Sequence, residues 1–174
     1  MEKLLILVDD QDNEIGVSDK LSAHQSGALH RAFSIFVFNS KGELLLQQRA
    51  DEKYHSAGLW SNTCCSHPCH GEEMKEVIQR RLNEEMGMGC SLEFKFSFIY
   101  KIQFENGLIE HEFDHVYFGK SDALPKPDLS EAKAYKYISL QKLKEEIESN
   151  PEHFSAWLKI CLEKVIENYN LKPL

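Results

Sequence analysis

Two long runs of alternating side chains, joined by a tight turn, constrain the fold of this chain most strongly. Residues 91–105 and 108–119 alternate between apolar and polar side chains, as the two faces of a β-strand require. The pair Asn106-Gly107 between them is typical of a β-hairpin turn. This part of the chain therefore predicts two antiparallel strands.

The remaining periodic segments place helices among further strands. Residues 34–38 and 44–48 predict another hairpin, and residues 4–9 and 133–140 predict single strands. Residues 72–86 carry an apolar side chain at every fourth position, from Met74 to Met86, which predicts an amphipathic helix. Two helical stretches close the chain. This order predicts an α+β fold, a mixed β-sheet with flanking helices, in a single domain of residues 1–174.

Length, charge and cysteine content limit the class of protein. The chain has 174 residues, 42% of them apolar, which suits one domain with a core of ordinary size. The net charge of −8, without a basic block, argues against a nucleic acid or an anionic membrane as the main partner. The apolar run at residues 4–8 is too short for a signal peptide, and no segment is long enough to span a membrane. Five cysteines, an odd number, indicate reduced thiols, so we expect a cytoplasmic protein. The apolar stripe of the final helix is most simply core, so we expect a monomer.

Residues 49–71 form a long segment without periodicity, and a loop of that length in a compact domain is usually functional. It contains three cysteines and two histidines between Cys64 and His70. A structural zinc site normally needs a second pair of ligands farther along the chain. Cys90 and Cys161 are lone residues, most simply small buried side chains, so a zinc knuckle is poorly supported.

Three histidines and two glutamates form a better candidate for a metal site. Glu110 and Glu112 lie two apart on a predicted strand, so their carboxylates project from the same face. Two such charges are costly side by side unless a cation or a shared proton relieves them. Together with His24, His30 and His67 they would suit Mn²⁺, Zn²⁺ or Mg²⁺. From the residues alone, two interpretations of these five side chains stay open: a metal site, and ordinary solvated side chains. The remaining histidines are interpreted as solvated surface: His55, His70, His111, His115 and His153.

The predicted central helix carries a modified diphosphate-hydrolase motif. Residues 66–88 nearly fit the Nudix box, G-x5-E-x7-R-E-U-x-E-E-x-G-U, in which U is a bulky apolar residue. The matching residues are Glu72, Arg80, Leu82, Glu84, Glu85, Gly87 and Met88. Two positions differ: Ser66 replaces the opening glycine, and Arg81 replaces a glutamate that helps to hold the metal in Nudix hydrolases. A guanidinium reverses the charge there, so the pattern predicts a Nudix-like fold without ordinary Nudix hydrolysis.

From about residue 4 to residue 160 the chain resembles the type 1 isopentenyl-diphosphate Δ-isomerases. The resembling blocks are residues 20–34, Arg49 with Lys53, "GLWSNTCCSHP" at 58–68, "RRLNEE" at 80–85, "GLIEHE" at 107–112 and "SAW" at 155–157. The resemblance implies a Nudix-like fold and interconversion of isopentenyl and dimethylallyl diphosphate in isoprenoid biosynthesis. One departure is Ser56-Ala57, where relatives often have Trp-Pro, which predicts a different pocket wall at that point.

The resemblance also implies roles for individual residues. Cys65 and Glu112 would be the proton-transfer pair, with Tyr100 hydrogen-bonded to Glu112 and Trp157 facing the isoprenoid tail. A divalent ion would be bound by His24, His30, His67, Glu110 and Glu112. Glu85 and the backbone carbonyl of Cys65 would hold a Mg²⁺ ion that bridges to the diphosphate. The implied diphosphate clamp consists of Lys20, Arg49, Lys53 and Arg81.

The chemistry of the residues agrees with these roles. Moving an isolated double bond requires a proton added at C4 and another removed from C2, with the cationic centre shielded from water. Two alternatives remain at this stage. A Nudix-type diphosphate hydrolase would share the fold but has no need of Cys65. A binding module with a structural zinc leaves the two glutamates and the basic residues unexplained.

Overall fold

The computed structural model describes residues 4–53 and 55–171. Its strands are β1 (Leu5–Val8), β2 (Glu14–Ser18), β3 (His30–Phe38), β4 (Glu43–Arg49), β5 (Trp60–Ser61), β6 (Cys64–Ser66), β7 (Leu92–Gln103), β8 (Ile109–Lys120) and β9 (Ala132–Ser139). Its helices are α1 (Lys20–Ser26), α2 (Met74–Met86), α3 (Leu140–Ser149), the 3₁₀ turn η1 (Pro151–His153) and α4 (Ala156–Leu171). Within the described ranges, no helix has the length and apolar character needed to cross a membrane.

The described strands form one mixed sheet around β3. β3 runs parallel to β8, from His30 opposite Glu112 to Phe38 opposite Lys120. It runs antiparallel to β6, where Ser34 lies opposite Cys65. The antiparallel pairs β7–β8 and β4–β9 extend the sheet. The predicted hairpins and the α+β class are confirmed, and the parallel pair β3–β8 sets residues 82 positions apart opposite each other on neighbouring strands.

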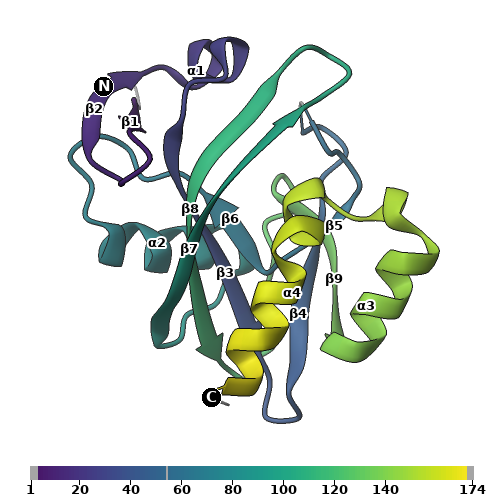
Figure 1. Cartoon of the computed structure of the whole chain (residues 1–174). Coiled ribbons are helices and arrows are strands. Elements are labelled where there is room, and N and C mark those ends of the chain that lie inside the picture. The colour runs from purple at the N-terminus through teal and green to yellow at the C-terminus, as the bar shows by residue number, and fades with distance from the viewer. Residues whose placement is uncertain (1–3, 54, 172–174) are drawn as a thin grey trace.

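Helices cover both faces of the sheet, with α2 on the left in Figure 1 and α3 and α4 on the right. Because β3 is buried on both faces, its sequence is almost continuously apolar. Phe33, Ile35 and Val37 pack in the core beneath α2. Phe36 and Phe38 pack in the core beneath α3 and α4. Burying each of these side chains stabilises the fold by roughly 1.5–3 kcal/mol.

Helix α2 has the amphipathic form that its sequence predicts. Ile78, Leu82 and Met86 are buried against the sheet. The helix ends at Gly87, whose φ of 60° is the left-handed conformation that glycine adopts without strain. Arg81 lines a cleft at the edge of the sheet, together with the buried Glu85 one turn later. The helix therefore contributes both to the core and to the candidate site.

The N-terminal region differs from its prediction in two respects. β2 begins at Glu14, in a segment where no strand was predicted, and β3 begins at His30 rather than at residue 34. Helix α1 was not predicted from the sequence. A helix of seven residues is marginal by itself, and this one depends on its Asp19 N-cap and on the burial of Ala23 and His24. Its position matters because it carries His24 into the candidate site.

Candidate active site

A cleft of about 300 Å³ collects most of the predicted site residues. It is formed where β6, β8, α2 and the start of α4 meet the segment after β4. The predicted residues that line it are Lys20, Arg49, Lys53, Cys65, His67, Arg81, Glu85, Tyr100, Glu110, Glu112 and Trp157. His24 and His30 are buried beside it, in contact with the two glutamates. The predicted residues therefore share one site although they are spread over most of the chain.

The histidines and glutamates form a compact cluster. Nitrogen or oxygen atoms of His24, His30, His67 and Glu110 all lie within 4.8 Å of one another. His24 Nε2 lies 3.2 Å from Glu110 Oε1, and His67 Nε2 lies 2.8 Å from Glu112 Oε1. The parallel pairing of β3 with β8 produces this arrangement, because it sets His30 beside Glu112. His30 Nε2 is 3.9 Å from Glu112 Oε1.

The protonation of this cluster suits a divalent cation. His24 Nδ1 and His30 Nδ1 donate to the backbone carbonyls of Lys20 and Ala28, which leaves the lone pair of each Nε2 facing the cluster. Burial lowers the pKa of His30 to about 4, so this imidazole is neutral at pH 7. Among the described residues, His30 Nε2 and Glu110 Oε2 are buried without a hydrogen-bond partner. Buried unsatisfied ligand atoms are costly, and a bound cation would satisfy them.

The two carboxylates have opposite pKa shifts. Burial, followed by the charge of Glu110, raises the pKa of Glu112 well above its usual value. Burial acts in the same direction on Glu110, but its close contacts with the His24 and His55 side chains outweigh it and lower its pKa. Without a cation, the pair therefore holds a proton on Glu112. A buried carboxylic acid facing a cleft can act as a proton donor.

Cys65 is the cysteine that lines the cleft; all five cysteines lie in the described part of the chain, and none of them forms a disulfide. Adjacent residues of β6 point to opposite faces, so Cys64 packs in the core beneath α2 instead. Burial raises the pKa of the Cys65 thiol, against the opposing effect of the Arg49 charge. The thiol is therefore protonated in the substrate-free cleft. Tyr100 Oη donates a 2.6 Å hydrogen bond to Glu112 Oε2, the contact that the family resemblance implied.

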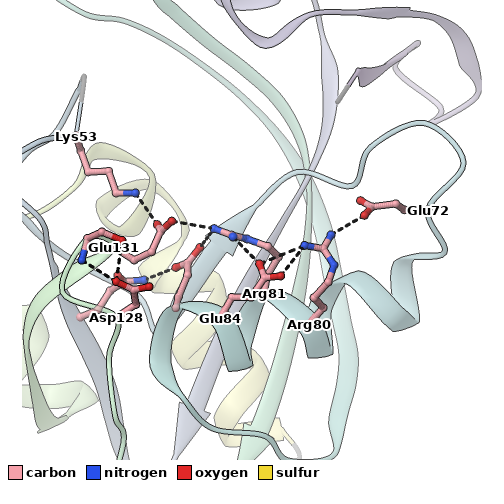
Figure 2. A network of polar contacts seen from close by, with 10 residues as sticks. Lys53, Glu72, Arg80, Arg81, Glu84, Asp128 and Glu131 are labelled. Atoms are coloured by element: carbon pink, nitrogen blue, oxygen red, sulfur yellow. Dashed lines mark hydrogen bonds and ion pairs between the residues drawn. The ribbon is translucent and has the colours of Figure 1, made fainter. Parts of the chain in front are cut away.

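Basic side chains also line the cleft, and Figure 2 shows the ion pairs that connect two of them. Lys53 Nζ lies 2.5 Å from one oxygen of Glu131, and an Arg81 nitrogen lies 3.7 Å from the other. The same arginine contacts Glu85 at 2.6 Å. Glu131 was not predicted as a site residue. Its carboxylate contacts both cationic groups, as an anionic ligand would.

Glu85 is buried beneath these residues, and Gln47 donates a 3.0 Å hydrogen bond to it. Burial raises its pKa, while the neighbouring Arg81 opposes this effect. A single buried carboxylate beside an anion-binding surface suits Mg²⁺, which usually binds through one or two carboxylates and the phosphates of a substrate.

Trp157 lines the cleft beside Arg49. Its indole Nε1 donates to Ser61 Oγ at 2.9 Å. The Arg49 guanidinium lies over the indole ring, 5.2 Å from its centroid. The apolar stripe predicted on the same helix, including Leu158 and Val165, is buried in the core as expected.

The interpretation of the other histidines as solvated surface was wrong for three of the five. His55 is only 6% exposed, and its Nε2 lies 3.0 Å from Glu110 Oε1. His111 and His115 are partly buried, against Gly27 and Asp12 respectively. His70 and His153 are exposed, as predicted. No spacing rule separates the buried histidines from the exposed ones, because their burial depends on distant segments.

Comparisons with known proteins agree with this architecture. The family described as NUDIX domain matches residues 28–158. An isopentenyl-diphosphate Delta-isomerase 2 from Aromatoleum aromaticum is 54% identical over 95% of this chain and 88% of its own length. An isopentenyl-diphosphate Delta-isomerase from Pectobacterium atrosepticum is 48% identical over 92% of this chain and 90% of its own.

A solved structure supports the fold. The crystal structure of DR0079 from Deinococcus radiodurans matches 93% of this chain and 98% of its own chain, with a TM-score of 0.78. Because the two sequences are only 20% identical, this likeness concerns the fold alone.

Proposed function

Because this chain belongs to the isopentenyl-diphosphate Delta-isomerases, within the Nudix fold, we propose that Cys65 and Glu112 transfer the protons of its reaction. The substrate is isopentenyl diphosphate and the product dimethylallyl diphosphate. The observation that carries the proposal is that a thiol, a protonated carboxyl group and the basic residues line the same cleft. Family membership confirms the predicted fold and enzyme class; the individual roles remain proposals.

In the proposed mechanism, Glu112 adds a proton to C4 of the alkene, which leaves a tertiary cation at C3. Cys65, whose thiol proton passes to solvent when the substrate binds, then acts as the thiolate and removes a proton from C2, and the electrons of that C–H bond form the new C2–C3 double bond. The raised pKa of Glu112 suits the acid. The Arg49 charge opposes the effect of burial on Cys65 and favours the thiolate. The Glu112 carboxylate regains a proton from solvent before the next turnover.

The hydrogen bonds of Glu112 suit this role. Tyr100 and His67 contact its two oxygens, so the carboxyl group has a fixed orientation toward the cleft. His24, His30, His67, Glu110 and Glu112 would hold the divalent ion. When bound, that cation supplies a positive charge that makes the Glu112 proton easier to release.

The diphosphate would bind on the basic side of the cleft. Lys53 and Arg81 would exchange the Glu131 carboxylate for phosphate oxygens, and Lys20 and Arg49 would complete the clamp. Glu85 and the Cys65 carbonyl would hold Mg²⁺ against the same group. Arginine suits position 81 because its planar guanidinium can donate two parallel hydrogen bonds to a phosphate.

The experiment that tests the function is NMR of isopentenyl diphosphate incubated with the metal-loaded protein in D₂O. We expect dimethylallyl diphosphate with deuterium in a methyl group, because the added proton comes from a group that exchanges with solvent. Release of inorganic phosphate or pyrophosphate without isomerisation would instead support a Nudix hydrolase. An unchanged substrate spectrum with Mg²⁺, Mn²⁺ and Zn²⁺ in turn would refute both activities.

Metal removal is expected to destabilise the protein as well as inactivate it. At a free-ion concentration of about 100 Kd, binding to the folded state alone contributes about 2.7 kcal/mol. For a domain of this size, that corresponds to a rise in Tm of roughly 5–10 °C. Scanning fluorimetry of chelator-treated protein, with and without added Mn²⁺, measures the shift. The exposed His70→Ala variant should keep the rise in Tm and His30→Ala should lose it; an equal rise in both would contradict the assigned site.

Trp157→Phe is expected to lower kcat about 5- to 30-fold. The prediction assumes that the indole face stabilises the cation at C3 by about 1–2 kcal/mol more than a benzene ring does. Trp60→Phe is the matched control, because the Trp60 ring contacts Lys136 and lies outside the cleft. Steady-state kinetics would show a kcat close to wild type for both variants if Trp157 only packs.

A further inference from the structure

His55 combines features that an exposed loop residue does not need. It lies between β4 and β5, yet its side chain is almost completely buried. Its Nε2 lies 3.0 Å from Glu110 Oε1. The sequence motifs discussed above assign it no role, and it falls in the segment where the pocket wall was predicted to differ from relatives.

Packing determines the orientation of the His55 ring. The ring stacks on Phe104, with centroids 4.9 Å apart and planes 18° apart, and meets Trp157 edge-on at 5.9 Å. Its Nδ1 lies 3.4 Å from the Ser56 hydroxyl, which can donate to it. A neutral histidine that accepts a hydrogen bond at Nδ1 carries its proton on Nε2. In His55, Nε2 is the atom that faces Glu110. Contacts from the β7–β8 hairpin and from α4 therefore aim one N–H group at one carboxylate oxygen.

His55 differs from the histidines of the metal cluster in the nitrogen that it presents. His24 and His30 donate from Nδ1 to backbone carbonyls and turn the Nε2 lone pair inward. These two belong to the group of ligand atoms within 4.8 Å of one another, and His55 does not. A donor at Glu110 Oε1, the oxygen 3.2 Å from His24 Nε2, fixes this carboxylate beside the cluster; Oε2 is buried without a hydrogen-bond partner among the described residues.

We infer that His55 is a positioning residue for the metal site: it donates from Nε2 to Glu110 Oε1 and so fixes the orientation of this carboxylate beside the His/Glu cluster. The inference rests on the metal site of the proposed function. Hydrogen-bond partners that orient a metal-binding side chain are known to change metal affinity about 10- to 100-fold when they are removed. Here, the partner comes from a loop that also contacts the indole of Trp157.

The test compares His55→Phe with His55→Gln. Phenylalanine keeps the ring contacts but has no donor, whereas the glutamine amide can donate to the same carboxylate. Co²⁺ affinity, measured by competition with a chromophoric chelator, should fall about 10- to 100-fold in His55→Phe and stay within a few-fold of wild type in His55→Gln. The Tm of the metal-free variants shows that both are folded. His70→Phe, at an exposed histidine, controls for the loss of an imidazole.

Several outcomes would overturn the inference. Wild-type affinity in His55→Phe would show that the donor has no effect, and equal losses in both variants would show that hydrogen-bond donation is not what matters. Absorption spectra of the Co²⁺ proteins that show a lost nitrogen ligand in both variants would make His55 a ligand instead. Isomerisation by a protein that binds no divalent ion at these residues would overturn the metal site and this inference with it. The expected affinity pattern in a wild type without isomerase activity would support His55 and overturn only the proposed reaction.

Discussion

Cys65→Ser is expected to lower isomerase turnover by about 10³-fold or more. A positioned general acid or base typically contributes 10²–10⁴-fold, and a serine hydroxyl ionises far less readily than a thiol. Serine has nearly the same size and the same place on β6, so the structure of the cleft should be retained. The measurement is the initial rate of dimethylallyl diphosphate formation by NMR, with saturating substrate and metal.

Cys69→Ser is the matched control for this variant. Cys69 is partly buried and lies outside the cleft, where its backbone N–H donates to Glu72. The control should turn over within about two-fold of wild type, as surface substitutions usually have small effects. Bound metal should be unchanged in both variants, since only the backbone carbonyl of Cys65 is assigned to an ion. Turnover by Cys65→Ser at the wild-type rate would exclude the thiol from proton transfer.

Glu112→Gln is the second substitution with a large expected effect, again a loss of about 10³-fold or more in turnover. Glutamine has the shape of glutamate and can still accept the hydrogen bond from Tyr100. It cannot release a proton to an alkene, because its amide is not an acid in this pH range. The variant therefore removes the proposed acid while keeping most of its contacts. Isomerisation and deuterium incorporation in D₂O are the measurements.

Metal affinity separates the two roles proposed for Glu112. Glu110 and the three histidines remain in this variant, so we expect Co²⁺ affinity to fall much less than turnover does. Glu105→Gln, an exposed change near the tip of the same hairpin, should behave as wild type. A loss of Co²⁺ affinity as large as the loss of turnover would mean that Glu112 acts through the metal and not as the acid.

Local sequence patterns were sufficient for much of the fold. The turn at Asn106-Gly107, the strands on either side of it and the stripe of α2 are all present in the structure. Each depends on the orientation of side chains relative to their own backbone, which the period of the sequence reveals directly. Short elements such as α1 were missed, because tertiary contacts and a single cap stabilise them more than their own pattern does.

Motifs in the sequence also predicted the family and a set of residues that share one cleft. Arg81, at a Nudix metal position, predicted loss of ordinary hydrolysis from its charge alone, and the chain belongs to an isomerase family. Among the cleft residues that were not predicted as site residues, His55 and Glu131 make ion pairs with predicted ones. Neither lies in a motif, and the contacts that define them are long-range: His55 meets a carboxylate 55 positions away, and Glu131 meets Lys53 across 78 positions.

The sequence by itself therefore determined which chemical groups this protein has and which local elements hold them. Only the tertiary structure decided which groups meet. The parallel pairing of β3 with β8 sets His30 beside Glu112, and the loop after β4 folds back so that His55 reaches Glu110. The physical reason is that side-chain periodicity reports on neighbours along the chain, whereas strand pairing and loop packing bring together residues that no local pattern connects.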